Sequence, residues 1–293
     1  MASTTEPAPA GTQPAAAAQI LELAHVYRIN LDATSSAGTI GLKEGRETGS
    51  SVEIQDFRDY VPGDDPRRID WLAYGRTDRL VVRLFREEVS PFFDVIVDTS
   101  ASMGIADGRK RALCTELSHW LYHSAKVQAV PVRVFAAGVE LSRLDGPEQV
   151  AFGESESILF VSPARAAAAL RRASVRLLLT DFMAPADPAA VLRALSAGCG
   201  TLIVVHVLGP WESDPKLEGP AVLDGVETGR RIDLNLDGRT VESYRSRLRA
   251  LLGVIRDEMF RCGGIYIGLV ADRTLEDVLK NDFLPAGLVE TRS

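Results

Sequence analysis

From Phe92 onward, short apolar runs alternate with segments whose apolar residues recur at helical spacing. The short runs predict buried strands, and the helical patterns predict amphipathic helices. We expect strands at residues 92–98, 131–136, 175–180, 201–207 and 265–270, and helices at 113–121, 164–173, 187–198, 244–259 and 274–283. This repetition predicts an α/β fold with a doubly wound, mostly parallel sheet that carries helices on both faces.

The chain before residue 91 follows a different pattern. Residues 1–18 are rich in Ala, Pro, Thr and Gln and carry one charge, Glu6, which is typical of a disordered tail. Apolar residues recur at helical spacing from Gln19 to Leu31, and residues 80–85 alternate like a strand. We therefore expect a disordered tail at 1–18, an N-terminal segment at 19–90 packed on the main domain, and a main domain at 91–293 with a hairpin insertion near 210–237.

Arg and Asp alternate along residues 58–71, between aromatic residues, and Pro62-Gly63 is a turn signal. A charged run is usually a solvated loop. Here the alternating signs allow Arg–carboxylate pairs, while Tyr60 and Trp71 supply apolar area. We therefore expect residues 58–71 to form an ordered surface packed against the sheet domain.

Oxygen-bearing side chains gather where two predicted strands end. Asp98 closes the first strand and is followed by Ser100 and Ser102, and Asp181 directly follows the strand at 175–180. Sheets of this class bind ligands at the carboxyl ends of their strands, and hard oxygen ligands suit Mg²⁺. The pattern therefore predicts a divalent metal site for Mg²⁺, with Mn²⁺ as a substitute. The alternative is that these residues start turns and helices, as Asp and Ser often do.

Composition narrows the class of protein. The net charge of −7 argues against a nucleic-acid partner. We see no apolar run as long as a membrane span, and the N-terminus lacks the pattern of a secretory signal. The three cysteines are far apart in sequence and fit neither a disulfide framework nor a zinc spacing. We expect a cytoplasmic protein with reduced cysteines.

Other candidate chemistry is weaker. His119 and His123 have the i, i+4 spacing of zinc ligands, but no Glu follows the first His as in H-E-x-x-H, which favours surface or structural histidines. His206 lies inside an apolar run and is interpreted as a core histidine. The sequence contains no G-x-S-x-G motif, phosphate-binding P-loop or dinucleotide fingerprint, so we expect no enzymatic activity.

Two stretches resemble known families. D-T-S-A-S-M at residues 98–103, followed by L-L-L-T-D at 177–181, is similar to the metal-ion-dependent adhesion site of von Willebrand factor A domains. The run F-R-D-Y-V-P-G-D-D-P-R-R-I-D-W-L-A-Y-G-R-T-D-R-L-V-V-R-L-F-R-E-E at 57–88 resembles the signature of the domain of unknown function 58 family. Members of that family are bacterial chains with an A-domain-like fold. The resemblance covers residues 35–293.

The resemblance implies a ligand set. Ser100 and Ser102 would bind Mg²⁺ directly, Asp98 and Asp181 would neutralise it directly or through water, and one position would stay open for a partner's Asp or Glu. The adhesion site also uses a threonine from an intervening loop. Because this chain has no Thr between residues 116 and 179, Ser162 is the nearest substitute.

The resemblance further implies a protein partner, since members of the family look like companions of MoxR-type AAA+ ATPases. We therefore predict a non-enzymatic cytoplasmic interaction module that acts with a MoxR-type ATPase, or with its client, in the assembly or activation of other proteins. Two alternatives stay open. One is a metal-dependent hydrolase that uses Asp98 and Asp181, and the other is a metal-free scaffold, which the missing threonine favours.

Overall fold

The chain forms two compact units in the computed structural model. The larger unit comprises Met1–Thr39 and Pro91–Ser293, and the smaller one comprises Ile40–Ser90. The structure describes residues 14–30, 52–61, 69–87, 92–104, 108–153, 156–184, 186–215, 219–224 and 231–292. Within these ranges, we find no helix with the length and apolar character needed to cross a membrane.

A six-stranded sheet is the centre of the larger unit. Its strands, in spatial order, are β11 (Ile265–Val270), β8 (Thr201–Leu208), β7 (Val175–Thr180), β4 (Phe93–Asp98), β5 (Val132–Ala137) and β6 (Leu141–Leu144). All neighbours pair in parallel except β6, which runs antiparallel to β5. Every residue of β4, β7 and β8 is buried, as expected for runs of aliphatic residues in a sheet covered on both faces. The mostly parallel α/β sheet predicted from the sequence is confirmed.

The strand order places a switch point between β4 and β7. The chain passes from β4 to β5 on one side, and returns later to add β7 on the other side of β4. Ligand sites in open α/β sheets lie at the carboxyl ends of strands beside such a reversal. Asp98 closes β4 and Asp181 follows β7, so both acids lie at this position.

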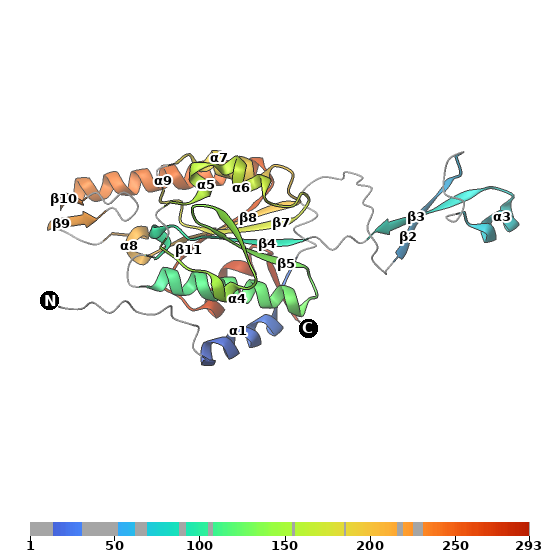
Figure 1. The fold of residues 1–293 in the computed structure, drawn as a ribbon, viewed down its shortest axis with the longest axis horizontal. Coiled ribbons are helices and arrows are strands. Elements are labelled where there is room, and N and C mark those ends of the chain that lie inside the picture. The colour runs from blue at the N-terminus through green and yellow to red at the C-terminus, as the bar shows by residue number, and fades with distance from the viewer. Residues whose placement is uncertain are drawn as a thin grey trace. The chain divides into compact units, whose positions relative to one another are not determined.

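Helices cover both faces of the sheet (Figure 1). One face packs against α1 (Pro14–Val26), α4 (Arg109–Val127), α10 (Leu275–Val278) and the π turn η4 (Leu279–Phe283). The other face packs against α5 (Ile158–Val161), α6 (Pro163–Ala168), α7 (Pro188–Ser196) and α9 (Gly238–Arg261). A short 3₁₀ turn, η3 (Pro147–Gln149), contacts α4. Two separate hydrophobic cores result, which is the doubly wound arrangement expected from the sequence.

The N-terminal boundary differs from the expectation. Helix α1 begins at Pro14 rather than Gln19, because Ala is the best helix former and Pro suits the first helical position. It ends at Val26, where β1 (Tyr27–Ile29) begins and pairs antiparallel with β12 (Val289–Thr291). Residues 14–29 therefore belong to the larger unit, and the smaller unit begins at Ile40 rather than at residue 19. Residues 1–13 of the expected tail lie outside the described residues.

Two helices also differ from the sequence pattern. The helix expected at 164–173 ends at Ala168, and the preceding turn of helix, α5, was not foreseen.

The expected hairpin corresponds to β9 (Gly219–Asp224) and β10 (Arg231–Leu236), which pair antiparallel within the predicted range 210–237.

The smaller unit is a hairpin with one short helix. Strand β2 (Val52–Asp59) pairs antiparallel with β3 (Val81–Glu87), and α3 (Trp71–Thr77) lies between them in sequence. Asp70 caps α3, because its Oδ1 accepts hydrogen bonds from the backbone N–H groups of Leu72 and Ala73 at 3.0 and 3.1 Å. The strand expected near 80–85 is thus present, and its partner β2 was missed.

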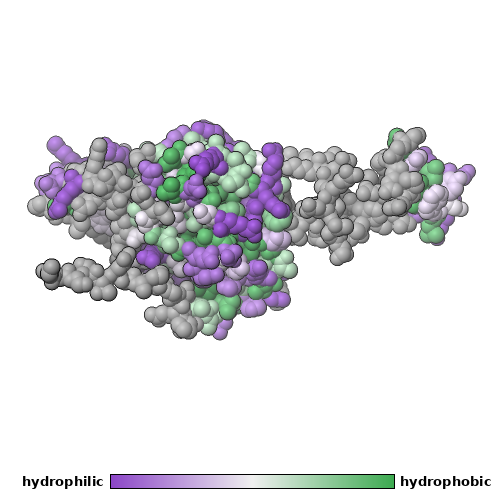
Figure 2. Space-filling view, viewed as in Figure 1, coloured by the Kyte–Doolittle hydropathy of each residue, from purple (hydrophilic) through white to green (hydrophobic). Residues whose placement is uncertain are grey.

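Helix α3 contributes no buried residue. Trp71 is 61% exposed and Leu72 is 66% exposed, and hydrophobic side chains are visible on the surface at this end of the unit (Figure 2). Within the smaller unit Trp71 is therefore not buried, and the expected packing of residues 58–71 against the sheet domain stays a prediction. Residues 62–68 of the predicted ordered surface lie outside the described residues.

Candidate functional site

Asp98 lies at the carboxyl end of β4 and is wholly buried. Its Oδ1 accepts a hydrogen bond from the Ser100 backbone N–H at 3.0 Å, and its Oδ2 accepts one from the Thr180 hydroxyl at 2.7 Å. An acid that accepts from the N–H two residues later is typical of a turn at a strand end. The chain then enters the 3₁₀ turn η2 (Ala101–Gly104), which carries Ser102.

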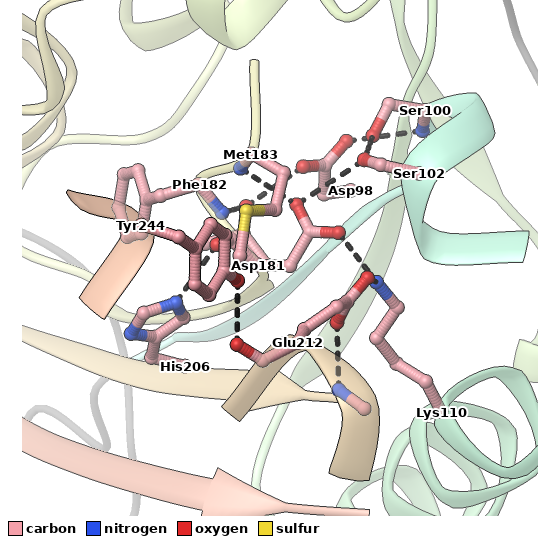
Figure 3. A network of polar contacts seen from close by, with 12 residues as sticks. Asp98, Ser100, Ser102, Lys110, Asp181, Phe182, Met183, His206, Glu212 and Tyr244 are labelled. Carbon is pink, nitrogen blue, oxygen red and sulfur yellow. Dashed lines mark hydrogen bonds and ion pairs between the residues drawn. The ribbon is translucent and has the colours of Figure 1, made fainter. Parts of the chain in front are cut away.

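Three side-chain oxygens form a row beside Asp98 (Figure 3). Ser100 Oγ and Ser102 Oγ are 3.1 Å apart, and Ser102 Oγ donates to Asp181 Oδ1 at 3.2 Å. The Met183 backbone N–H also donates to Asp181 Oδ1, at 2.9 Å. The structure therefore brings together four of the five residues that the sequence proposed as metal ligands.

The fifth candidate, Ser162, is not part of this network. It lies between α5 and α6, where its backbone N–H bonds to the Ile158 carbonyl, and its hydroxyl makes no capping bond. The nearby Ser157 is also engaged elsewhere, because its hydroxyl donates to the Ala137 carbonyl at 2.9 Å. Thr180, directly before Asp181, instead donates its hydroxyl to Asp98, in addition to the bond from Ser102 to Asp181.

A lysine that the sequence analysis missed completes the site. Lys110 of α4 is wholly buried, and its Nζ lies 2.7 Å from Asp181 Oδ2 and 2.6 Å from Glu212 Oε1. Glu212 lies on α8 (Pro210–Ser213), directly after β8, and its other oxygen accepts from the Gly209 N–H at 2.6 Å. A signal was present in the sequence: Lys110 falls on the same helical stripe as the buried Leu113, Cys114 and Leu117.

Further polar residues support the backbone of the site. His206 Nε2 hydrogen-bonds to the Asp181 carbonyl at 2.8 Å, and its Nδ1 lies 3.0 Å from the Tyr266 hydroxyl. The Tyr244 hydroxyl of α9 donates to the Glu212 carbonyl (Figure 3). Burial lowers the pKa of His206, so the neutral ring is favoured. His206 is therefore a hydrogen-bonded core histidine, as the sequence indicated.

The electrostatics of the site favour a further positive charge. Burial, and then the nearby charge of Asp181, raise the pKa of Asp98 to about 7, although hydrogen bonds from Thr180 and Ser100 oppose this. Burial alone would lower the pKa of Lys110, but the charges of Asp181 and Glu212 raise it overall, so the ammonium form is held firmly. Asp98 is the acid that this cation does not contact.

Hydroxyl and carboxylate oxygens are the kinds of ligand that a hard divalent ion takes. Among the described residues, no group of three or more His, Cys, Asp or Glu side chains is arranged to hold a metal. His119 and His123, whose ring centroids are 6.3 Å apart, therefore gain no third ligand of these types from the described chain. A metal site at Asp98 and Asp181 would depend on the serine hydroxyls, which are acceptable ligands for Mg²⁺.

Comparison with known sequences supports one of the two resemblances. Residues 56–143 match the family model described as "Protein of unknown function DUF58". The match contains the 57–88 signature and runs through β4 and α4 to β6. Uncharacterized proteins of Mycobacterium bovis and of two Mycobacterium tuberculosis strains are each 26% identical over 289 residues, which cover 91% of this chain and 88% of the relative.

Two solved structures are similar at low identity. An aerotolerance-related membrane protein from Bacteroides fragilis is 15% identical, with a TM-score of 0.32, over 61% of this chain and 91% of that chain. A conserved hypothetical protein, BatB, from Bacteroides thetaiotaomicron is 12% identical, with a TM-score of 0.31, over 61% of this chain and 90% of that chain.

Proposed function

We propose that the larger unit is a von Willebrand A-like protein-interaction module that binds its partner through a divalent metal ion held at Asp98, Ser100, Ser102 and Asp181. The observation that carries the proposal is the row of Ser100 Oγ, Ser102 Oγ and Asp181 Oδ1, with separations of 3.1 and 3.2 Å. Adjacent ligands of an octahedral Mg²⁺, with bonds of about 2.1 Å, stand about 3 Å apart. The separations of 3.1 and 3.2 Å are those of hydrogen bonds, and they also match the spacing of adjacent ligands of such an ion.

The charge of the site supports the same proposal. Lys110 contacts Asp181 and Glu212 but not Asp98, so the site has a formal charge of 1 − 3 = −2 when Asp98 is ionised. One divalent ion balances that charge. When bound, the ion would supply a Lewis-acidic position for a carboxylate of the partner, while this chain's acids and hydroxyls hold the ion in place.

The partner that we propose is a MoxR-type AAA+ ATPase or its client, on the basis of the family resemblance. A non-enzymatic role is supported by the hydrogen bonds and ion pairs that engage the polar groups around Asp98 and Asp181. The serine hydroxyls bond to each other, Lys110 is ion-paired, and both ring nitrogens of His206 have partners. None of these described groups is a free base or nucleophile beside Asp98.

A pull-down in two buffers tests the proposal. The purified chain is mixed with the purified MoxR-type ATPase of the same organism, in Mg²⁺ or in EDTA. We expect retention in Mg²⁺ that is lost in EDTA and lost with Asp98→Ala. Ser162→Ala is the matched control, since this serine stands outside the network, and it should bind like the parent.

The opposite outcomes separate the alternatives. Equal retention in EDTA and with Asp98→Ala would favour the metal-free scaffold. Turnover of a phosphate ester or carboxylic ester by the purified chain, abolished by Asp98→Asn, would favour the metal-dependent hydrolase.

A further inference from the structure

The ammonium group of Lys110 lies inside the protein, between two carboxylates from different elements. Its side chain is 0% exposed, and its contacts are Asp181 Oδ2 at 2.7 Å and Glu212 Oε1 at 2.6 Å. A charge buried this deeply is retained when oppositely charged partners compensate for the lost hydration. Lys110 is thus a permanent cation at the carboxyl ends of the strands, where Asp98 and Asp181 lie.

The two oxygens of Asp181 are divided between two roles. Oδ1 accepts from Ser102 Oγ and from the Met183 N–H, whereas Oδ2 is the one that contacts Lys110. An ion bound beside Ser102 would therefore share the Asp181 carboxylate with Lys110 (Figure 3). Two cations on one carboxylate repel each other, and the repulsion is strong where water is excluded.

We propose that Lys110 is the resident counter-cation of this site and that it limits the site's affinity for divalent metal ions. The inference rests on the proposed function for the identity of the metal site. Lys110 is a positioning residue here, because it acts on a bound ion through Asp181. In the metal-free protein the charge of Lys110 balances that of the Asp181 carboxylate. Metal binding is correspondingly weak.

Glu212 opposes this effect of Lys110. Its carboxylate shares the ammonium with Asp181, and it is fixed from the other side by the Gly209 N–H. The hydrogen bond from Tyr244 to the Glu212 carbonyl holds the same turn against α9. If Glu212 loses its charge, the charge of Lys110 is directed wholly at Asp181. Removal of the two charges should therefore change metal affinity in opposite directions.

The test measures Mg²⁺ affinity by calorimetry and the Mg²⁺-induced rise in melting temperature, on the full chain. We expect Lys110→Met to bind Mg²⁺ about tenfold more tightly than the parent and to gain more in melting temperature, because a competing charge is removed close to the ion. We expect Glu212→Gln, which keeps an acceptor for Lys110 and for the Gly209 N–H, to bind several-fold more weakly.

Arg133→Met is the matched control. Arg133 forms a bidentate pair with the buried Asp94, with contacts of 2.7 and 2.6 Å, near the other end of β4. Removing it also deletes a cation from a buried ion pair, so it should lower the melting temperature. The Mg²⁺ affinity should stay at the parent value.

Lys110→Met leaves the carboxylates of Asp181 and Glu212 without their cation, which destabilises the folded protein. The double variant Lys110→Met with Glu212→Gln removes both members of the Lys110–Glu212 ion pair. It should still bind Mg²⁺ more tightly than the parent, since Asp181 Oδ2 loses its cation. This variant keeps the measurement possible where the single variant is insoluble.

The outcomes separate this inference from the proposed function. Equal affinity in the parent and the Lys110 variants would overturn the inference and leave the metal site intact. Binding by the Lys110 variants alone would support the inference and overturn metal use by the parent protein. Absence of binding in the parent and in every Lys110 variant would overturn both.

Discussion

The Thr180 hydroxyl donates a 2.7 Å hydrogen bond to Asp98 Oδ2 and so connects the carboxyl ends of β7 and β4. The orientation of this hydroxyl is fixed, because its oxygen accepts from the Phe182 backbone N–H at 3.2 Å. Phe182 adopts the left-handed conformation, with φ of 50°, so the chain turns sharply after Asp181. Thr180 thereby orients the Asp98 carboxylate and belongs to the site, although it occupies a strand end rather than the intervening loop.

Thr180→Val should destabilise the fold and weaken Mg²⁺ binding at the proposed metal site. Valine has nearly the same shape as threonine but cannot donate, so the pKa of Asp98 should rise above its value of about 7. Loss of a buried hydrogen bond to a carboxylate should lower the free energy of unfolding by about 1.5–3 kcal/mol. Urea denaturation and Mg²⁺ titration measure the two effects. Thr180→Ser, which keeps the hydroxyl, should lie closer to the parent, and an equal loss in both variants would contradict this role.

The raised pKa of Asp98 predicts how stability depends on pH in the absence of metal. The folded carboxyl holds its proton up to about pH 7, whereas the unfolded carboxyl has a pKa of 3.8. The folded state therefore binds the extra proton, and this contribution to stability is complete below pH 3.8 and lost as the pH rises through 7. The loss is on the order of 4 kcal/mol for a shift of this size.

Asp98→Asn provides the comparison for that pH profile. It has no carboxyl to ionise, so its stability measured in EDTA should fall less between pH 4 and pH 8 than that of the parent. Saturating Mg²⁺ should flatten the parent profile, because a bound cation favours ionised Asp98. Parallel profiles for the parent and Asp98→Asn in EDTA would show that Asp98 is not the group responsible.

The layout of the sheet could be predicted because it depends on local patterns. The mostly apolar runs at β4, β7 and β8 predict a buried parallel sheet, and an acid at the end of such a run marks the strand end. Asp98 and Asp181 could therefore be placed together from the sequence alone. The short pairing of β1 with β12 could not, because three-residue strands far apart in sequence leave no periodic signal.

Lys110 and Glu212 were missed for a related reason. A lysine inside Arg109-Lys110-Arg111 is normally solvated, and its burial depends on α8, which lies about one hundred residues later in the chain. Ser162 was proposed because it stands before a helix, but its position relative to Asp98 depends on the turn α5, which the sequence did not indicate. For Lys110, Glu212 and Ser162, the position of the side chain relative to Asp98 depends on tertiary contacts rather than on residue type.

Because α3 has no buried residue, we expect Asp70→Ala to destabilise the smaller unit more than Trp71→Ala does. Asp70→Ala removes the cap of α3 and should lower the stability of this unit by about 1 kcal/mol. Trp71→Ala should cost less than that, because Trp71 is mostly exposed and its main ring contact is with Tyr74, at 6.3 Å between centroids. Thermal unfolding followed by circular dichroism compares them. A loss of 2 kcal/mol or more for Trp71→Ala, about the value for a buried large side chain, would show that the helix is covered.

The ion pair of Asp94 and Arg133 should respond asymmetrically to the loss of either partner. Asp94 is wholly buried, while Arg133 is 11% exposed and stacks near the rings of Phe92 and Phe135. Arg133→Met leaves a buried carboxylate without its cation, which should cost about 3 kcal/mol or more. Asp94→Asn leaves a guanidinium that still reaches water and keeps its aromatic contacts, so about 1–2 kcal/mol is expected. Urea denaturation at pH 7 gives both values, and a larger loss for Asp94→Asn would mean that Arg133, rather than Asp94, is the group that depends on the pair.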